Sequence, residues 1–215
     1  IPQILECGND ISEHYDNLIN YKGPYGSYKH KKLLYLCMVS IYILEGIRFY
    51  VSFACSWAFA ELKQMEGNAK IIKLIARDEN LHLAASLNII RTLIKDDKDF
   101  DEIKLETHDE VMKLFEECLI QEEEWCDYLF GNGSMIGLNS ELLKEYVRWI
   151  GAKRIKSLGY TVPFHTHMHN PLPWTEKWIS GGNVQVAPQE TEITSYVVGG
   201  VKQDVNKKSF EGLSL

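Results

Sequence analysis

The pattern of hydrophobic and polar positions predicts a chain built from helices up to about residue 158. The predicted helices span residues 8–21, about 31–65, about 68–95, about 107–130 and about 139–158. The first helix is short and amphipathic, whereas the second is hydrophobic nearly all round. A helix that is apolar on every side is typical of the middle of a bundle. The pattern therefore predicts an all-α bundle.

Turn-forming residues separate these helices. Glycine and proline break the chain at residues 23–26, and a charged turn at residues 96–99 ends the third helix. Thr107 and Glu110 have the spacing of a capping box, which predicts the start of the fourth helix. Gly159 follows the fifth helix at the C′ position, where glycine is favoured.

The character of the sequence changes after Pro163, because several prolines and glycines exclude further long helices. From Ala187 onward the residues are polar and β-prone, without the alternation that a partner strand requires. We expect an extended, mobile tail there. The predicted organisation is a helical body over residues 1–186 and a tail over residues 187–215.

Length and composition fit one substantial hydrophobic core, since 45% of the 215 residues are hydrophobic. The net charge of −7 argues against a phosphate-binding nucleic-acid surface, which needs clustered lysine and arginine. The apolar stretch from Leu33 to Ala60 contains Glu45 and Arg48, so we interpret it as a buried helix and expect no membrane span. No signal peptide heads the chain, and its first residue, Ile1, fits a processed or partial chain.

The five cysteines are scattered, odd in number and contain no Cys-x-x-Cys pair. This usage is unlike a disulfide framework and indicates reduced thiols in the cytoplasm.

Candidate chemistry lies at Glu45, Glu79 and His82. Residues at positions i and i+3 share a helix face, so Glu79 and His82 can point at one atom. A carboxylate and an imidazole suit a divalent metal such as iron, manganese or zinc. Helix bundles with di-iron sites use two lone glutamates and two Glu-x-x-His pairs. This chain has one of each, which is half of such a set.

Each part of this metal site has an alternative. Glu45 in an apolar helix needs a partner, and a salt bridge to Arg48 satisfies it as well as a metal does, from spacing alone. Glu-x-x-His pairs also occur by chance on exposed helices, but here the flanking residues predict a buried helix. Those flanking residues are Ile71, Ile72, Leu74, Ile75, Leu81 and Leu83.

A second histidine cluster, His165, His167 and His169, forms the run HTHMH. In an extended segment all three side chains share one face. We interpret the run as a compositional pattern rather than a metal site.

Four runs of sequence carry a family resemblance: LEGIRFYVSFACSWAFAE, MEGNAKIIKLIARDENLHL, YLFGNGSMIGLN and NVQVAPQETEITSYVVG. They resemble, in order, the radical-generating small subunit of class I ribonucleotide reductase. The match covers nearly the whole chain and corresponds to the C-terminal part of that subunit, after its first metal-ligand helices. The resemblance implies a ferritin-like di-iron helical bundle, present here in part.

The resemblance implies roles for individual residues. Glu45, Glu79 and His82 correspond to ligands of the second metal of a dinuclear centre, loaded with two irons or with manganese and iron. Asp78 corresponds to an aspartate in a hydrogen-bonded chain that leads away from the metal. The residues Phe49, Phe53 and Ile75 correspond to the dry pocket around the stable tyrosyl radical. The radical tyrosine itself has its family position upstream of Ile1.

In the tail, the resemblance makes Tyr196 a redox relay to the large subunit, assisted by Glu190. The terminal apolar residues Phe210, Leu213 and Leu215 correspond to a peptide that docks on that subunit. A mobile segment loses its ordering entropy only on binding, which gives specificity with moderate affinity. The implied partners are the large subunit, the missing N-terminal part of the small subunit and a second copy in a homodimer.

The implied function is the reduction of ribonucleoside diphosphates as part of a cytoplasmic oxidoreductase, with this chain inactive without the N-terminal part. One alternative is a non-catalytic partner that binds the large subunit through its tail. A second alternative is a ferritin-like oxidase, which keeps the ligands but has no use for the Tyr196 tail.

Overall fold

The computed structural model describes the backbone of residues 2–179 and the side chains of residue 8 and residues 12–179. Within this range every regular element is a helix. The elements are α1 (Pro2–Ile19), α2 (Tyr28–Ile43), the π-helical η1 (Leu44–Arg48), α3 (Tyr50–Glu61), α4 (Glu66–Asp96), α5 (Lys98–Glu106), α6 (His108–Phe130), α7 (Ser140–Ser157), the 3₁₀ turn η2 (Pro173–Thr175) and α8 (Glu176–Ile179).

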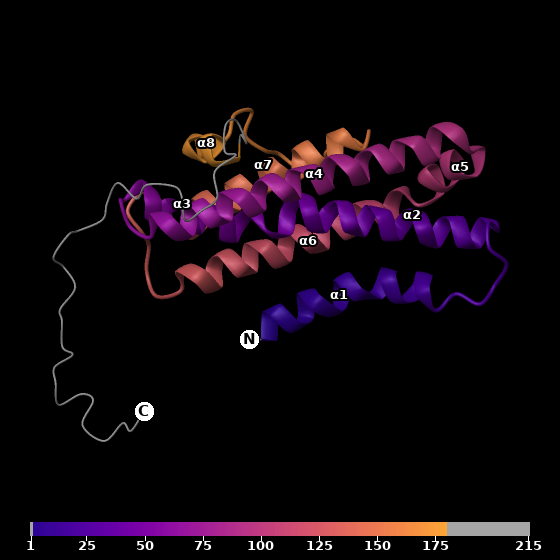
Figure 1. Ribbon diagram of the computed structural model, residues 1–215, viewed down its shortest axis with the longest axis horizontal. Coiled ribbons are helices and arrows are strands. Elements are labelled where there is room, and N and C mark those ends of the chain that lie inside the picture. Colours follow the sequence, from indigo (N-terminus) through magenta and orange to yellow (C-terminus); the bar gives the residue numbers. More distant parts are fainter. Residues whose placement is uncertain (1, 180–215) are drawn as a thin grey trace, which may run out of the picture.

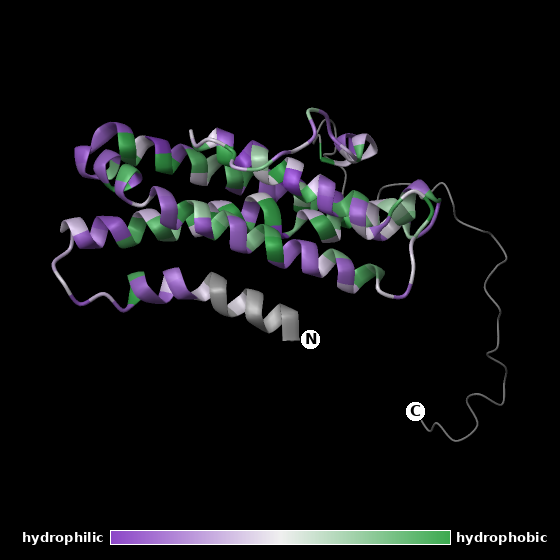
Figure 2. Cartoon of the chain, turned by 180° about the vertical axis from the view of Figure 1, so that it is seen from behind, coloured by the Kyte–Doolittle hydropathy of each residue, from purple (hydrophilic) through white to green (hydrophobic). Residues whose placement is uncertain are grey.

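The long helices lie along one common axis (Figure 1). Helices α6 and α7 pack on each other, α3 packs on α4, and α1 packs mainly on α2. The element η1 lies between α2, α4 and α7, so the π-helical turn is near the centre of the bundle. Hydrophobic and hydrophilic residues alternate along α4 and α6, as expected for helices that bury one face (Figure 2).

Aromatic residues make up much of the core. The side chains of Tyr35, Tyr42, Tyr50, Phe115 and Tyr146 are fully or almost fully buried. The hydroxyl groups of Tyr35 and Tyr160 are 2.8 Å apart and hydrogen bond to each other. This hydrogen bond fixes the segment after α7, which contains Tyr160, against Tyr35 of α2.

The predicted helix over residues 31–65 is present but is not regular. Its middle is the π-helical η1, and α3 ends at Glu61 rather than near Met65. The early end has a backbone cause, because Lys63 and Met65 both take positive φ values of 61° and 50°. Non-glycine residues in that region end a right-handed helix.

The predicted end of the third helix at the charged residues 96–99 is confirmed, since α4 ends at Asp96 and Asp97 is extended, but a further helix that was not predicted, α5, starts at Lys98. Asp97 caps α5 by accepting a hydrogen bond from the Asp99 backbone N–H at 3.0 Å. Lys31 reaches Asp97 at 2.6 Å and Asp99 at 2.7 Å, which ties α5 to α2.

The fourth predicted helix is confirmed as α6, but the prediction that a capping box starts it is wrong. The Thr107 hydroxyl donates to the Ile103 carbonyl of α5 at 2.7 Å and makes no cap hydrogen bond. By contrast, α7 starts as a capped helix, with the Asn139 side chain accepting from the Leu142 N–H. Gly159 has a φ of +85°, as predicted for its C′ position.

After Pro163 the described residues form only η2 and α8, in agreement with the prediction of no long helix. The predicted tail at residues 187–215 lies outside the described residues. The four described cysteines, Cys37, Cys55, Cys118 and Cys126, are free thiols.

The prediction that α4 is buried is wrong for one face. Ile71, Ile75, Leu81 and Ile89 are between 41% and 65% exposed, whereas Leu83 and Ile90 on the opposite face are in the core. Among the described elements, α4 packs on α2, α3, α5, η1 and α8. The outer apolar face of α4 is therefore open in the described part of the chain.

One stretch, Tyr28–Glu61, is long and apolar enough to cross a membrane by length and composition alone. More than half of its most apolar window, 56%, is buried inside the protein, as in the core helix of a soluble fold.

Candidate metal centre

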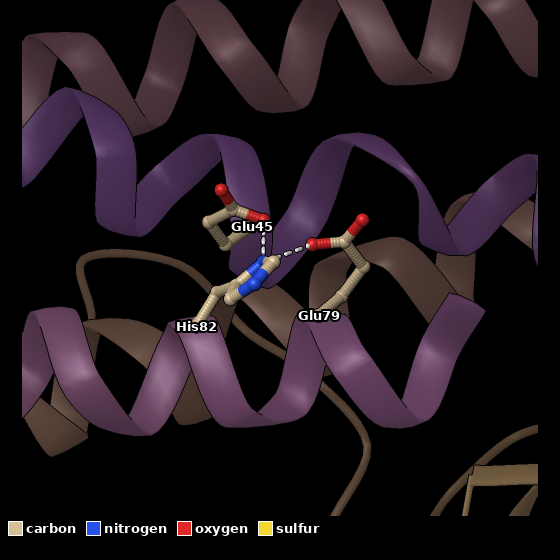
Figure 3. Close-up of side chains that lie close together, drawn as sticks. All are labelled: Glu45, Glu79 and His82. Carbon is tan, nitrogen blue, oxygen red and sulfur yellow. Dashed lines mark hydrogen bonds and ion pairs between the residues drawn. The ribbon is translucent and has the colours of Figure 1, made fainter. Parts of the chain in front are cut away.

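Glu45, Glu79 and His82 meet between two neighbouring helices (Figure 3). Glu45 comes from η1, and the other two come from α4. The Nδ1 atom of His82 is 2.9 Å from Glu79 Oε2 and 3.6 Å from Glu45 Oε2. One potential ligand atom from each side chain lies within 4.8 Å of the others. The sequence prediction that these residues converge is confirmed.

Local structure explains this convergence. Glu79 and His82 are three residues apart on a regular helix, so their side chains lie one turn apart on the same face. Glu45 is in the π-helical turn, where the wider spiral changes the direction of side chains relative to a regular helix. π-Helical turns of this kind occur frequently at functional sites.

The site is buried on one side and open on the other. The side chains of Glu45 and Glu79 are 17% and 16% exposed, whereas His82 is 60% exposed. The open side is the same outer face of α4 that carries the exposed isoleucines.

The surroundings of Glu45 and His82 raise the pKa of both groups. Burial raises the pKa of Glu45 to about 7, and the hydrogen bond and negative charge of Glu79 add to this, while His82 opposes it. The hydrogen bond to Glu79 raises the pKa of His82, with the charge of Glu45 acting in the same direction. Without a cation, Glu45 and His82 therefore both hold a proton more tightly than usual.

These residues fit a divalent metal ion. Glu45 Oε2 is buried and has no hydrogen-bond partner, so one lone pair faces the centre of the group unsatisfied. Two carboxylates and one imidazole are ligands that iron and manganese accept. A cation at this position would satisfy the orphan oxygen and remove the repulsion between the carboxylates.

The alternative of a salt bridge between Glu45 and Arg48 is wrong. The carboxylate that pairs with Arg48 is Glu122 of α6, at 3.9 Å, on the other side of η1. Burial raises the pKa of Glu122 to about 8, with Arg48 opposing the shift. Sequence reasoning missed this pair, although a signal was present. Glu122 lies on the helical stripe of buried residues formed by Val111, Phe115, Cys118, Leu119 and Cys126.

Comparison with known proteins agrees with this geometry. The family described as "Ribonucleotide reductase, small chain" matches residues 9–171, which is most of the chain and includes all three ligand candidates. The chain belongs to this family.

Relatives in the ribonucleotide reductase small chain family resemble nearly the whole chain. This chain is 45% identical to the ribonucleoside-diphosphate reductase subunit beta of Haemophilus influenzae, over 99% of its own length. It is also 45% identical to the ribonucleoside-diphosphate reductase 1 subunit beta of Escherichia coli O157:H7. The chain spans about 61% of the length of each relative.

A solved structure confirms the predicted ferritin-like fold. A ribonucleotide reductase R2 subunit from Clostridium botulinum superposes with a TM-score of 0.72. The superposition covers 83% of this chain and 53% of that chain, at 24% sequence identity.

Two of the three residues predicted to line a dry pocket lie together. The rings of Phe49 and Phe53 stack with centroids 5.9 Å apart, and Phe53 is buried against Trp57. Ile75 is 41% exposed on the outer face of α4, so the described residues do not enclose it. The pocket role of these residues stays a prediction.

Asp78 is exposed and directly precedes Glu79, one of the candidate ligands. Both Arg77 Nε and Arg77 Nη2 donate to Asp78 Oδ1 at 3.2 Å, so a structural ion pair is present. The proton-path role of Asp78 stays a prediction. Tyr196 and Glu190 lie outside the described residues.

The histidine run His165, His167 and His169 does not gather around a point. All three are exposed, and His167 Nε2 lies 3.3 Å from Glu145 Oε2. In the described part of the chain, the group with metal-binding spacing is the one at Glu45.

Proposed function

We propose that this chain supplies one half of the two-metal centre of a ribonucleoside-diphosphate reductase small subunit. The observation that carries the proposal is the convergence of Glu45, Glu79 and His82, with the unsatisfied Glu45 oxygen facing the group. The family match over residues 9–171 and the beta-subunit relatives support it.

In this proposal, Glu45, Glu79 and His82 hold one metal ion of a di-iron or manganese–iron centre. When bound, the metal pair supplies the oxidising chemistry that generates the amino-acid radical of the enzyme. The chain's own contribution is to orient the ligands and keep water from one side of them. The stacked rings of Phe49, which is partly buried, and Phe53, which is buried, provide the dry side of the centre.

The second half of the site comes from helices that cover the outer face of α4. Exposed isoleucines lie on that face together with His82, whose side chain is 60% exposed, as expected where another helical layer packs. These helices correspond to the part of the relatives' length that this chain does not span. They bring the remaining ligands and enclose Ile75, which completes the pocket.

The remaining roles follow from the same assignment. Asp78 joins the hydrogen-bonded path out of the centre. Tyr196, assisted by Glu190, relays the oxidising equivalent to the large subunit, because a phenol can lose its proton and electron together. The chain acts in the cytoplasm, as part of a homodimer that binds the large subunit through residues 187–215.

Metal stoichiometry tests the proposal. Under anaerobic conditions we expect one equivalent of Fe²⁺ per isolated chain, lost in Glu79→Gln and His82→Ala variants. Two equivalents are expected once the complementary N-terminal helices of a relative are added and co-purify with the chain. Two irons bound by the isolated chain, or none under either condition, would contradict the proposal.

Partner binding tests the role of the tail. Deletion of residues 187–215 should abolish binding to a large subunit and leave Fe²⁺ binding unchanged. A ferritin-like oxidase would keep its function after this deletion, so unchanged turnover in the shortened chain would favour that alternative.

A further inference from the structure

Arg154 of α7 reaches two groups on the segment that carries Glu45. Its Nε atom donates to the backbone carbonyl of Gly46 at 3.0 Å, and its Nη2 atom donates to the hydroxyl of Tyr50 at 3.2 Å. The guanidinium also lies over the Tyr50 ring, 5.4 Å from its centroid. The planar guanidinium of Arg154 therefore binds Gly46 and Tyr50 at the same time.

The Gly46 carbonyl is a special acceptor because it lies in the π-helical turn. A π-helical turn departs from the regular hydrogen-bond ladder, so a side-chain donor can stabilise its carbonyls. Gly46 is buried, and a Cβ atom there would lie 3.2 Å from Arg154 Cδ and Nε. The same Cβ would lie 2.9 Å from Leu83 Cδ1 of α4. Glycine thus permits the close approach of both α7 and α4.

Tyr50 carries the connection on to the second ligand helix. Its hydroxyl accepts from Arg154 and donates to Asn80 Oδ1 at 3.0 Å, so both of its roles are used. Asn80 directly follows Glu79 on α4. Tyr50 is only 1% exposed, so solvent does not offer these groups replacement partners.

We propose that Arg154 and Tyr50 are positioning residues that fix the distance between Glu45 on η1 and the Glu79–His82 pair on α4. They touch no ligand atom themselves. The chain of contacts runs from Gly46 through Arg154 and Tyr50 to Asn80, and it links the two helices beside the ligands. This inference rests on the proposed metal site and adds the residues that hold it in shape.

Three variants distinguish a positioning role from a general loss of stability and from a simple loss of positive charge. Tyr50→Phe removes only the linking hydroxyl. Arg154→Lys keeps the positive charge, but one ammonium group cannot replace the fork that reaches both acceptors. Tyr35→Phe is the matched control, because it also removes a buried tyrosine hydroxyl bond, in a pair with Tyr160 away from the site.

The first measurement needs no metal. Amide hydrogen exchange of the full chain should be faster in segments 44–50 and 78–83 in Tyr50→Phe and Arg154→Lys, relative to wild type. Tyr35→Phe should leave both segments unchanged. Wild-type exchange in both test variants, or equal acceleration in the control, would overturn the inference.

The second measurement uses Co²⁺ as the probe. We expect both test variants to bind Co²⁺ about 10-fold more weakly, since outer partners of ligands typically contribute this much. Their visible Co²⁺ spectrum should also shift, while Tyr35→Phe keeps the wild-type affinity and spectrum. Unchanged affinity and spectrum in both test variants would contradict a positioning role.

The two measurements keep this inference distinct from the proposed function. A wild-type chain that binds no Co²⁺ speaks against the metal site, and hydrogen exchange alone then decides whether the two helices are linked. Faster exchange in both segments supports the link, and unchanged exchange removes it.

Discussion

Glu45 is the residue in which the demands of folding and of metal binding differ most. The same carboxyl is largely buried, faces a second carboxyl and has an oxygen without a hydrogen bond. Such a group is unfavourable in a bundle that only has to be stable. The proposed metal ion, shared by the three side chains, would account for its presence.

The raised pKa of Glu45 predicts pH-dependent metal binding. At pH 6 the carboxyl, with its pKa of about 7, is mostly protonated, and His82 also holds its proton more tightly than usual. Metal ligands must be deprotonated, so the affinity for Co²⁺ should rise between pH 6 and pH 8. The gain is at most about tenfold per pH unit for each proton displaced.

Calorimetric titration in two buffers of different ionisation enthalpy measures the protons released on binding. We expect release at pH 6.5 and much less at pH 8. The variant Glu45→Gln should bind more weakly and release fewer protons. Affinity that does not change over this pH range would contradict the assignment.

Glu122 predicts a second pH effect, on stability rather than binding. Burial raises its pKa from 4.5 to about 8 in the folded protein, so the folded state holds this proton more tightly than the unfolded state. The resulting stabilisation is complete below about pH 4.5 and is lost as the pH rises through 8. The free energy of unfolding should therefore fall over this range, by at most about 1.4 kcal/mol per pH unit.

Urea unfolding from pH 5 to pH 8 checks this effect. Glu122→Gln should flatten the profile, because glutamine does not titrate. Glu116→Gln, at an exposed position of the same helix, is the control and should keep the wild-type slope. Parallel profiles for wild type and Glu122→Gln would show that the carboxyl is already ionised in the fold.

At the scale of single residues, the sequence predicted the candidate ligands whose spacing follows a regular helix. Glu79 and His82 follow from the period of a helix, and Glu122 could have been found on the buried stripe of α6. Tyr50 and Arg154 could not, because their contacts depend on how the π-helical turn rotates the chain. Spacing rules assume a regular helix, and η1 is not one.

At the scale of elements, η1 joins α2 to α3 and packs against α4 and α7 at the same time. Gly46 is the point of closest approach, so its substitution tests the packing of the whole turn. Gly46→Ala places a methyl group 2.9 Å from Leu83 and 3.2 Å from Arg154. We expect a loss of about 1–3 kcal/mol in the free energy of unfolding, as for other overpacked cores.

Chemical denaturation measures this loss, and Gly131→Ala is the matched control. Gly131 ends α6 with a φ of −58°, and an added Cβ would meet only ordinary contacts at 3.5 Å and 3.6 Å. The control should therefore change stability by less than about 0.5 kcal/mol. Equal effects of the two substitutions would contradict close packing at η1.

The sequence predicted the long helices well because their periodic patterns extend over many turns. It missed α5, whose residues 98–106 follow a run of charges that resembles a turn. It also missed the early end of α3, which depends on the positive φ angles at Lys63 and Met65. Both errors arise where local backbone geometry, rather than the hydrophobic pattern, decides the structure.

At the scale of the molecule, the open face of α4 is the main difference from a closed bundle. Sequence analysis predicted a buried α4 from its apolar residues, and those residues are indeed suited to burial. The described elements that pack on α4 leave this face open. A pattern indicates that a face is apolar, but not which part of a protein covers it.

Two adjacent isoleucines of α4 test this openness. Ile90 is 1% exposed and Ile89 is 45% exposed. In the isolated chain, Ile90→Ala should cost about 2–5 kcal/mol of unfolding free energy, as for buried isoleucines. Ile89→Ala should cost far less, because it leaves no cavity.

Thermal or urea unfolding of the two variants gives the comparison. When the complementary helices are added, Ile89→Ala should weaken their association and Ile90→Ala should not do so selectively. Equal losses in the isolated chain would mean that the face of α4 is already covered in solution.

The wide turn at Leu44–Arg48 also constrains how related proteins can differ in length. A regular helix advances 100° per residue, so one residue more or less in this turn rotates everything after it by that angle. Deleting a single residue here would turn the Phe53 and Trp57 side of α3 away from its present neighbours. Insertions and deletions should therefore be absent from this turn among working relatives, even where loops vary freely.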